Sequence, residues 1–277
     1  ATLPPGGVTV TCTPSGLGRV LGHGSSLSTV TRKVVAGSLD SSMYLDKFCW
    51  NLSHRHLVGY LTSSRMSTRT FVNSGHCGDI ISALPTIREL GGGKLVITNH
   101  HLAPHAWRPM RGQWFEIPSA YEALRPLLLS LPYITDVEWQ DNPTDFTHDF
   151  RDFRRMYLPT RSLALAHAMH LGLDSVDLSP WIDVSGYQSE VAKNKMSGKV
   201  AVSRTDRHLT WDFPWAHFLS QYECVFIGLQ HEREIFEREF GTKVDFFPTT
   251  NFLEVAVAIA ASQHFIGNQS CPCWIAM

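Results

Sequence analysis

From about residue 68 onward, short runs of β-branched and apolar residues alternate with longer segments of helical periodicity. The predicted strands are residues 70–73, 95–98, 136–140, 199–203, 223–227, 243–246 and 263–266. The predicted helices lie between them, at residues 79–90, 119–130, 161–171, 214–221, 231–240 and 252–261. Strands that alternate with helices of this length pair in parallel, because each helix returns the chain to the start of the next strand. The alternation therefore predicts an α/β fold.

The alternation lapses between residues 174 and 198, where Pro180 and the polar run 186–190 interrupt it. We therefore expect two Rossmann-like domains, at residues 68–185 and 186–277. Residues 1–67 are expected to form a leader or linker of low order, because the first forty are rich in Gly, Ser, Thr and Pro. The chain stops within an apolar helical pattern at residues 274–277, which predicts that the second domain is incomplete at its C-terminus.

Composition excludes several classes of function. A net charge of −1 argues against a surface that coats nucleic acid, so we expect no nucleic-acid partner. The 14 histidines are scattered, and the nearest thing to a cluster is His100, His101 and His105. No cysteine or acid lies at metal-ligand spacing from that cluster, so we expect no metal site. The sequence has no apolar run of about 18 residues, so we expect no transmembrane segment. A cytoplasmic protein is expected, with a peripheral place at a membrane as the alternative.

Residues 75–90 combine a glycine-rich turn, an acid and an apolar helical pattern. Gly75 and Gly78 follow the first predicted strand and permit a tight turn, and Asp79 comes next. The carboxyl end of a parallel strand is where open α/β folds bind ligands, so an acid held there is a natural general base. The simpler interpretation of Asp79 is a helix N-cap, since Asp is favoured at that position. The residues alone leave both interpretations open.

The run 78–88, Gly-Asp-Ile-Ile-x-x-Leu-Pro-x-Ile-Arg, resembles the N-terminal signature of the family 9 glycosyltransferases, the heptosyltransferase-like proteins. In that family the Asp after the Gly is the proposed catalytic base, so the resemblance implies this role for Asp79. It also implies the GT-B arrangement, in which two Rossmann-like domains face each other across a crevice. The dinucleotide fingerprint Gly-x-Gly-x-x-Gly is absent from this run.

The second half contains a segment that resembles the donor domain of the same family. Residues 200–207 run from a predicted strand into a polar loop that contains Arg204 and Arg207. The resemblance implies that these arginines hold the diphosphate of a nucleotide sugar, and the arginine fork suits phosphate oxygens. The alternative is that they pair with Asp206 or face solvent.

Residues 265–272 resemble the C-terminal signature of the family, Gly-Asn-Asp-Ser-Gly-Pro before a helix. The resemblance implies that the turn binds the donor phosphates through Gly267, Asn268, Gln269 and Ser270. The sequence departs from the signature at Gln269, which replaces the acid, at Cys271, which replaces the small Gly, and at Trp274, which replaces a frequent His. The alternative is an ordinary strand-to-helix turn capped by Ser270.

Six cysteines are spread along the chain, at positions 12, 49, 77, 224, 271 and 273. We interpret them as buried or incidental thiols of a reducing compartment. Cys77 lies beside the glycine-rich turn, but no His/Asn constellation can be identified for a cysteine nucleophile, so packing is the favoured role.

The resemblance implies an inverting glycosyltransferase that needs neither metal nor cofactor. It would move a sugar from a nucleotide-diphosphate donor to a carbohydrate or glycolipid acceptor, such as lipopolysaccharide. The departures at residues 269, 271 and 274 favour a second hypothesis, an inactive family member that binds a nucleotide sugar or a carbohydrate. A third is another activity on the same fold, such as a nucleotide-sugar epimerase.

Overall fold

Strands and helices alternate along the chain as the periodicity predicts, and the α/β class is confirmed. The computed structural model describes residues 9–13, 69–99, 119–156, 162–187, 189–205 and 213–277. All of these residues belong to one compact unit. The predicted boundary between residues 185 and 186 stays a prediction.

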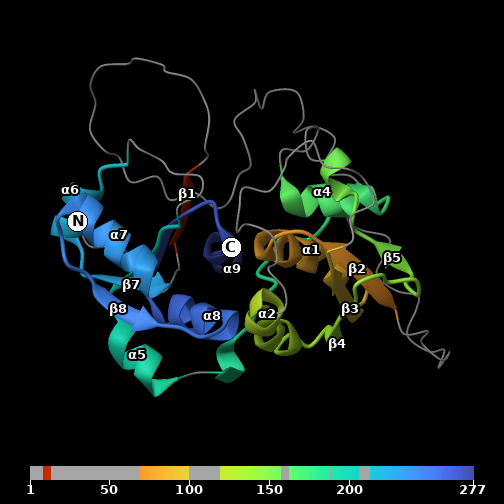
Figure 1. The fold of residues 1–277 in the computed structure, drawn as a ribbon, viewed down its shortest axis with the longest axis horizontal. Helices are drawn as coiled ribbons and strands as arrows, with labels where there is room; N and C mark the ends of the chain where they lie inside the picture. Colours follow the sequence, from red (N-terminus) through yellow and green to blue (C-terminus); the bar gives the residue numbers. More distant parts are fainter. Residues whose placement is uncertain (1–8, 14–68, 100–118, 157–161, 188, 206–212) are drawn as a thin grey trace, which may run out of the picture. The chain divides into compact units, whose positions relative to one another are not determined.

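The first sheet is wholly parallel and has the order β4-β3-β2-β5 (Figure 1). Its strands are β2 (Thr70–Ser74), β3 (Gly93–Thr98), β4 (Ile134–Trp139) and β5 (His148–Asp149). The chain therefore moves outward from β2 through β3 to β4 and then returns to the other side of β2. The connections diverge between β2 and β5, which is the topological switch point where such sheets bind ligands.

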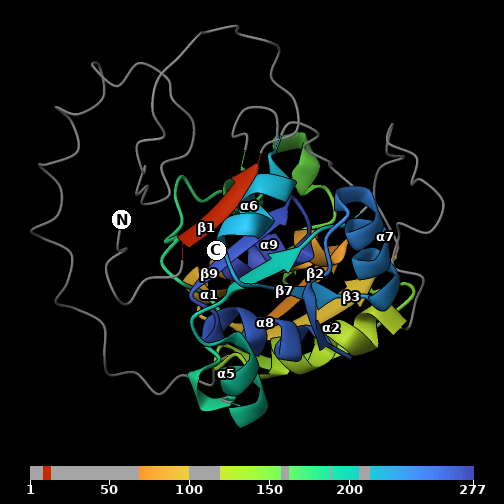
Figure 2. The same cartoon turned by 90° about the vertical axis from the view of Figure 1, so that its left-hand side faces the viewer.

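The second sheet repeats this order and adds one strand. Its strands are β6 (Val200–Ser203), β7 (Cys224–Gly228), β8 (Asp245–Pro248), β9 (His264–Asn268) and β1 (Thr9–Thr13). They pair in parallel in the order β1-β9-β6-β7-β8, so the switch point lies between β6 and β9. Both sheets thus belong to the Rossmann-like class. Figure 2 shows β1 beside β9 at the edge of this sheet.

The sequence pattern predicts no strand before residue 68, so β1 was missed. Its residues, Thr-Val-Thr-Cys-Thr, are strand formers, but they lie within a segment rich in Gly, Ser, Thr and Pro, and no helical pattern follows them. All five residues of β1 are in register with β9. The segment predicted to be a leader of low order therefore contributes an edge strand to the second sheet.

The helices confirm most of the predicted ranges. They are α1 (Cys77–Glu89), α2 (Ser119–Leu129), α4 (Leu163–His170), α5 (Glu190–Met196), α6 (Trp215–Gln221), α7 (Gln230–Phe240), α8 (Phe252–Ala261) and α9 (Cys271–Ala276), with 3-10 turns η2 (Phe153–Met156) and η3 (Ser185–Tyr187). Helix α5 was missed, because it lies in the segment where the alternation lapses. Ser189, whose side chain accepts a hydrogen bond from the Ala192 N–H, was the available signal.

Side chains of the second sheet alternate between two apolar layers, as the period of a strand requires. Val200 and Val202 of β6 pack with Trp215 of α6 and Phe236 of α7. Ala201, between the two valines, belongs to the larger core on the other face, which includes buried residues of α8 and of the first sheet. Helices thus cover both faces of this sheet, as is typical of parallel sheets.

Helices that follow different sheets pack on one another within this unit. Helix α2 contacts α8, and α1 contacts α9. The core continues through these contacts, since Leu84 of α1 and Ile275 of α9 belong to the same buried cluster. Helices α1 and α9 each begin directly after a strand at a switch point, so their contact brings the two switch points together.

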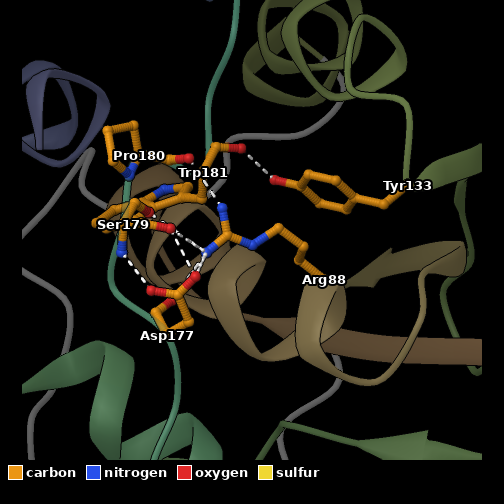
Figure 3. Close-up of polar contacts among 6 residues, drawn as sticks. All are labelled: Arg88, Tyr133, Asp177, Ser179, Pro180 and Trp181. Atoms are coloured by element: carbon orange, nitrogen blue, oxygen red, sulfur yellow. Dashed lines mark hydrogen bonds and ion pairs between the residues drawn. The ribbon is translucent and has the colours of Figure 1, made fainter. Parts of the chain in front are cut away.

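Arg88, the last residue of the family-like run, binds the segment that connects α4 to α5 (Figure 3). Its guanidinium donates to the carbonyl oxygens of Pro180 (2.8 Å), Asp177 (2.9 Å) and Ser179 (3.3 Å). It also contacts the Asp177 carboxylate at 3.2 Å. The Tyr133 hydroxyl donates to the neighbouring Trp181 carbonyl at 2.6 Å. The segment that contains the predicted domain boundary is therefore held against α1 by hydrogen bonds from the Arg88 side chain to its backbone carbonyls.

Candidate functional site

Asp79 is buried in the first turn of α1, and it is not the N-cap that the simpler interpretation predicted. The N-cap is His76, and Asp79 occupies the third helical position of a capping box. Its Oδ2 atom accepts a hydrogen bond from the His76 backbone N–H at 3.0 Å. The carboxylate thus closes the turn that leads from β2 into the helix.

Arg154 is the second partner of this carboxylate. Its Nη2 atom lies 2.5 Å from Asp79 Oδ2, although the residues are 75 positions apart. Asp79 follows β2 and Arg154 follows β5, so their pairing bridges the switch point of the first sheet. The Arg154 side chain is 40% exposed, while that of Asp79 is 4% exposed. The pair therefore joins a buried carboxylate to a partly exposed guanidinium.

His167 of α4 lies in the same region and is completely buried. Its ring stacks on Phe153 with the centroids 3.7 Å apart and meets the edge of Phe150 at 5.2 Å. Burial lowers the pKa of His167 well below its ordinary value, and the charge of Arg154 acts in the same direction, while the nearby Asp79 backbone opposes the shift. The imidazole is therefore neutral and supports the site as a packing group.

The two glycines of the predicted turn have different roles. Gly75 has a φ of +129°, and a Cβ atom there would lie 2.6 Å from Asp79 Oδ2, so this position requires glycine. Gly78 lies inside α1, and the prediction that it forms the loop is wrong. A Cβ atom at Gly78 would lie 3.0 Å from Cδ1 of Trp274. Its small size lets α9 approach the start of α1.

Asn268 connects the two loops at the switch point of the second sheet. Its Oδ1 accepts from the Thr205 N–H at 3.1 Å, and its Nδ2 donates to the Thr205 carbonyl at 2.9 Å and hydroxyl at 3.1 Å. Gly267 permits close packing, since a Cβ atom there would lie 2.7 Å from the Phe265 ring. The predicted turn 267–270 is thus fixed to the end of β6.

Ser270 and Gln269 complete this turn. Ser270 is the N-cap of α9 by position, but its side chain makes no cap hydrogen bond, and its hydroxyl donates to the Asn268 carbonyl at 3.2 Å. Ser270 therefore occupies the N-cap position through its backbone alone, and the predicted side-chain cap is absent. Gln269 is half-buried.

Arg204 is buried and forms a two-point ion pair with Glu239 of α7, at 2.6 and 2.9 Å. Its guanidinium also lies over the Phe240 ring, 5.1 Å from the centroid. The partner differs from Asp206, which the sequence analysis considered. Arg207 and Asp206 lie outside the described residues. The phosphate-binding role of both arginines stays a prediction, and for Arg204 it requires that Glu239 release it.

The cysteines differ from the expectation in one respect. Cys77, Cys224 and Cys271 are free thiols, whereas Cys273 is disulfide-bonded. The interpretation of all six cysteines as thiols is therefore wrong for Cys273. Disulfides persist in oxidising compartments, so this bond weighs against the reducing environment that we inferred from the sequence.

Other features of the described residues lie away from the switch points. A surface hollow of about 270 Å³ is lined by Lys199, Cys224 and Asp245, at the amino ends of β6, β7 and β8. A second, of about 360 Å³, lies against α7 and the turn 241–243. No helix in the described part of the chain is long and apolar enough to cross a membrane. No group of three His, Cys, Asp or Glu side chains in that part is placed to hold a metal ion.

Sequence reasoning missed Arg154, Glu239 and His167. Arg154 lies in the run 149–155, Asp-Phe-Arg-Asp-Phe-Arg-Arg, where charges and aromatic residues alternate next to a short strand. That basic run was the available signal for a cation at the sheet edge. Glu239 and His167 lie within helices and have no local pattern that identifies them.

Comparison of this chain with protein-family models, with curated proteins and with solved structures finds no match. The geometry of the two switch points therefore carries the functional argument.

Proposed function

We propose that this protein is a glycosyltransferase with the GT-B arrangement, which moves a sugar from a nucleotide-diphosphate donor to a carbohydrate acceptor. One observation carries the proposal. Two of the three segments that resemble family 9 enzymes, residues 78–88 and 265–272, lie at the switch points of the two sheets, and the helices that contain or follow them, α1 and α9, contact each other. Switch points are where open α/β sheets bind ligands, so acceptor and donor sites would be adjacent.

Asp79 is the proposed general base. Among the described residues, both hydrogen bonds to its carboxylate end on Oδ2, so Oδ1 is the oxygen that would take the proton of the acceptor hydroxyl. The acceptor oxygen then attacks the anomeric carbon from the side opposite the diphosphate, and the configuration inverts. Arg154 and the His76 N–H hold the carboxylate in one orientation during this step, which is the preorganisation that proton transfer needs.

The donor diphosphate is placed at the switch point between β6 and β9. The Asn268 side chain joins the ends of β9 and β6 there, with Gly267 packed beside the Ser203 carbonyl and Gln269 and Ser270 next along the turn. Arg204 reaches the phosphates if they displace Glu239, since both partners are anions that suit the guanidinium fork. In this proposal charge stabilisation by arginine takes the place of a metal.

Nucleotide binding tests the proposal. Calorimetry with UDP, ADP and GDP and with the matching nucleosides should show that one diphosphate binds more tightly than its nucleoside, and that the difference shrinks with salt. Arg204→Ala should weaken the diphosphate more than the nucleoside. Lys199→Ala is the matched control, because it removes a positive charge from the opposite end of the same strand. Absence of diphosphate binding, or equal losses in both variants, would contradict the donor site.

The ion pair between Arg204 and Glu239 favours a second candidate, a protein that binds nucleotide sugars or carbohydrates without turnover. Gln269, which replaces the acid of the family signature, points the same way. Release of nucleoside diphosphate from the tightest-binding nucleotide sugar separates the two candidates. Release that depends on Asp79 supports the enzyme, and binding without release supports the binding protein.

A further inference from the structure

Two free thiols meet where α1 contacts α9. Cys77 is the first residue of α1, and Cys271 is the first residue of α9. A Cβ atom built on Gly78, the neighbour of Cys77, would lie 4.0 Å from the Cα atom of Cys271. The two side chains pack on the same core cluster, and Cys77 is close enough to Cys271 to raise its pKa. The pair thus joins backbones that follow different sheets.

We propose that Cys77 and Cys271 form a reversible disulfide by exchange with a low-molecular-weight disulfide of the glutathione class. A disulfide needs Cα atoms about 4.4–6.8 Å apart, and the close approach of the two helix starts, with Cys271 Cα 4.0 Å from a Cβ position on Gly78, brings the cysteines together for it. The oxidant would reach the pair at Cys77, which is only partly buried. The site is separate from the bonded Cys273, two residues beyond Cys271.

The exchange takes place in two balanced steps. The Cys77 thiolate attacks one sulfur of the small disulfide, so that a mixed disulfide forms and one small thiolate leaves. The Cys271 thiolate then attacks the Cys77 sulfur, and the second small thiolate leaves. The two protein thiols lose two protons and two electrons, and the small disulfide is reduced to two thiols.

The order of these steps follows from the surroundings of the two thiols. Burial raises the pKa of Cys271 well above its ordinary value, and its contact with Cys77 raises that pKa further. Cys77 is therefore the first nucleophile. When Cys77 enters the mixed disulfide, its sulfur can no longer carry a negative charge beside the Cys271 thiol, so the contributions of Cys77 to the raised Cys271 pKa disappear.

Mass spectrometry after incubation with glutathione disulfide tests the proposal. The wild-type chain should lose two thiols, retain no glutathione and yield a peptide pair that links Cys77 to Cys271. Cys271→Ser should instead trap one glutathione on Cys77. Cys224→Ser, which changes a free thiol outside the pair, should behave like the wild type.

Three results would overturn the proposal. The first is a wild-type chain that keeps glutathione on Cys77 as Cys271→Ser does. The second is oxidation that leaves both thiols free to alkylate, and the third is a linkage from Cys271 to any cysteine other than Cys77. If a serine variant fails to fold, the wild-type peptide map still decides the question.

Discussion

Replacing Arg88 by Ala should lower the free energy of unfolding by about 2–3 kcal/mol. The guanidinium donates to two backbone carbonyls at 2.8 and 2.9 Å, those of Pro180 and Asp177. Each of these two hydrogen bonds should contribute about 1–1.5 kcal/mol net to the free energy of unfolding. This value is low for a charged donor, because the Arg88 side chain is 24% exposed. The longer contacts to Ser179 add little. Urea unfolding measures the loss, with an unchanged slope as evidence that the native state is otherwise intact.

Asp177→Asn is the matched control for this change. It removes the exposed ion pair but keeps the side-chain oxygen that accepts from the Ser179 N–H and leaves all the backbone carbonyls in place. Its effect should be well under half of that of Arg88→Ala. Faster hydrogen exchange at residues 181–184 in Arg88→Ala alone would show that the connecting segment has been released. Equal losses in the two variants, or no loss in Arg88→Ala, would refute the reasoning.

Three further perturbations test other parts of the structure. The pKa of His167 lies well below its ordinary value of 6.5 in the folded state, so the unfolded state binds the proton first as the pH falls. The free energy of unfolding should therefore drop below pH 6.5 by up to about 1.4 kcal/mol per pH unit. A His167→Phe variant with the same pH dependence between 7.5 and 5.5 would argue against this. Gly78→Val should cost about 1–3 kcal/mol and change the fluorescence of Trp274, whose ring lies 3.0 Å from the added Cβ position, whereas Gly186→Ala, which meets nothing within 4 Å, should change neither. Thiol titration in denaturant should detect at most four of the six cysteines before reduction and all six after it, because Cys273 is disulfide-bonded, and six before reduction would disprove that bond.

Local patterns were sufficient to predict most of the fold. Helix α8 begins and ends where the sequence predicts, because Asn251 caps an apolar segment through a hydrogen bond from the Glu254 N–H. The two-residue strand β5 and the edge strand β1 were missed, since each is defined by the strand that it pairs with. The order of the strands in each sheet could not be predicted either, because hydrophobic periodicity identifies helices and strands but not which strands pair.

In the candidate site too, local features could be predicted from the sequence and long-range partners could not. Asp79 was identified from its run, because the spacing of the turn and helix is local. Its partner Arg154 was not, because the two residues meet only when β5 returns beside β2. Arg204 shows the converse case, since the sequence presented it as available for phosphate while the fold pairs it with Glu239, 35 residues away. Ion pairs between residues of different helices and strands therefore decide which charged side chains are available to bind a ligand.

The most direct test of the proposed function compares Asp79→Asn with the wild-type chain in the release of nucleoside diphosphate from the tightest-binding nucleotide sugar, with a carbohydrate acceptor present. The amide can still accept from the His76 N–H, so the fold and donor affinity should stay close to those of the wild type. Asp152→Asn is the control, because it removes a nearby carboxylate that pairs with Arg155 and not with Arg154. The proposal predicts a loss of roughly 10²–10⁴ in rate for Asp79→Asn alone. Turnover at the wild-type rate in Asp79→Asn, or no release by the wild-type chain from any nucleotide sugar that it binds, would contradict the proposal.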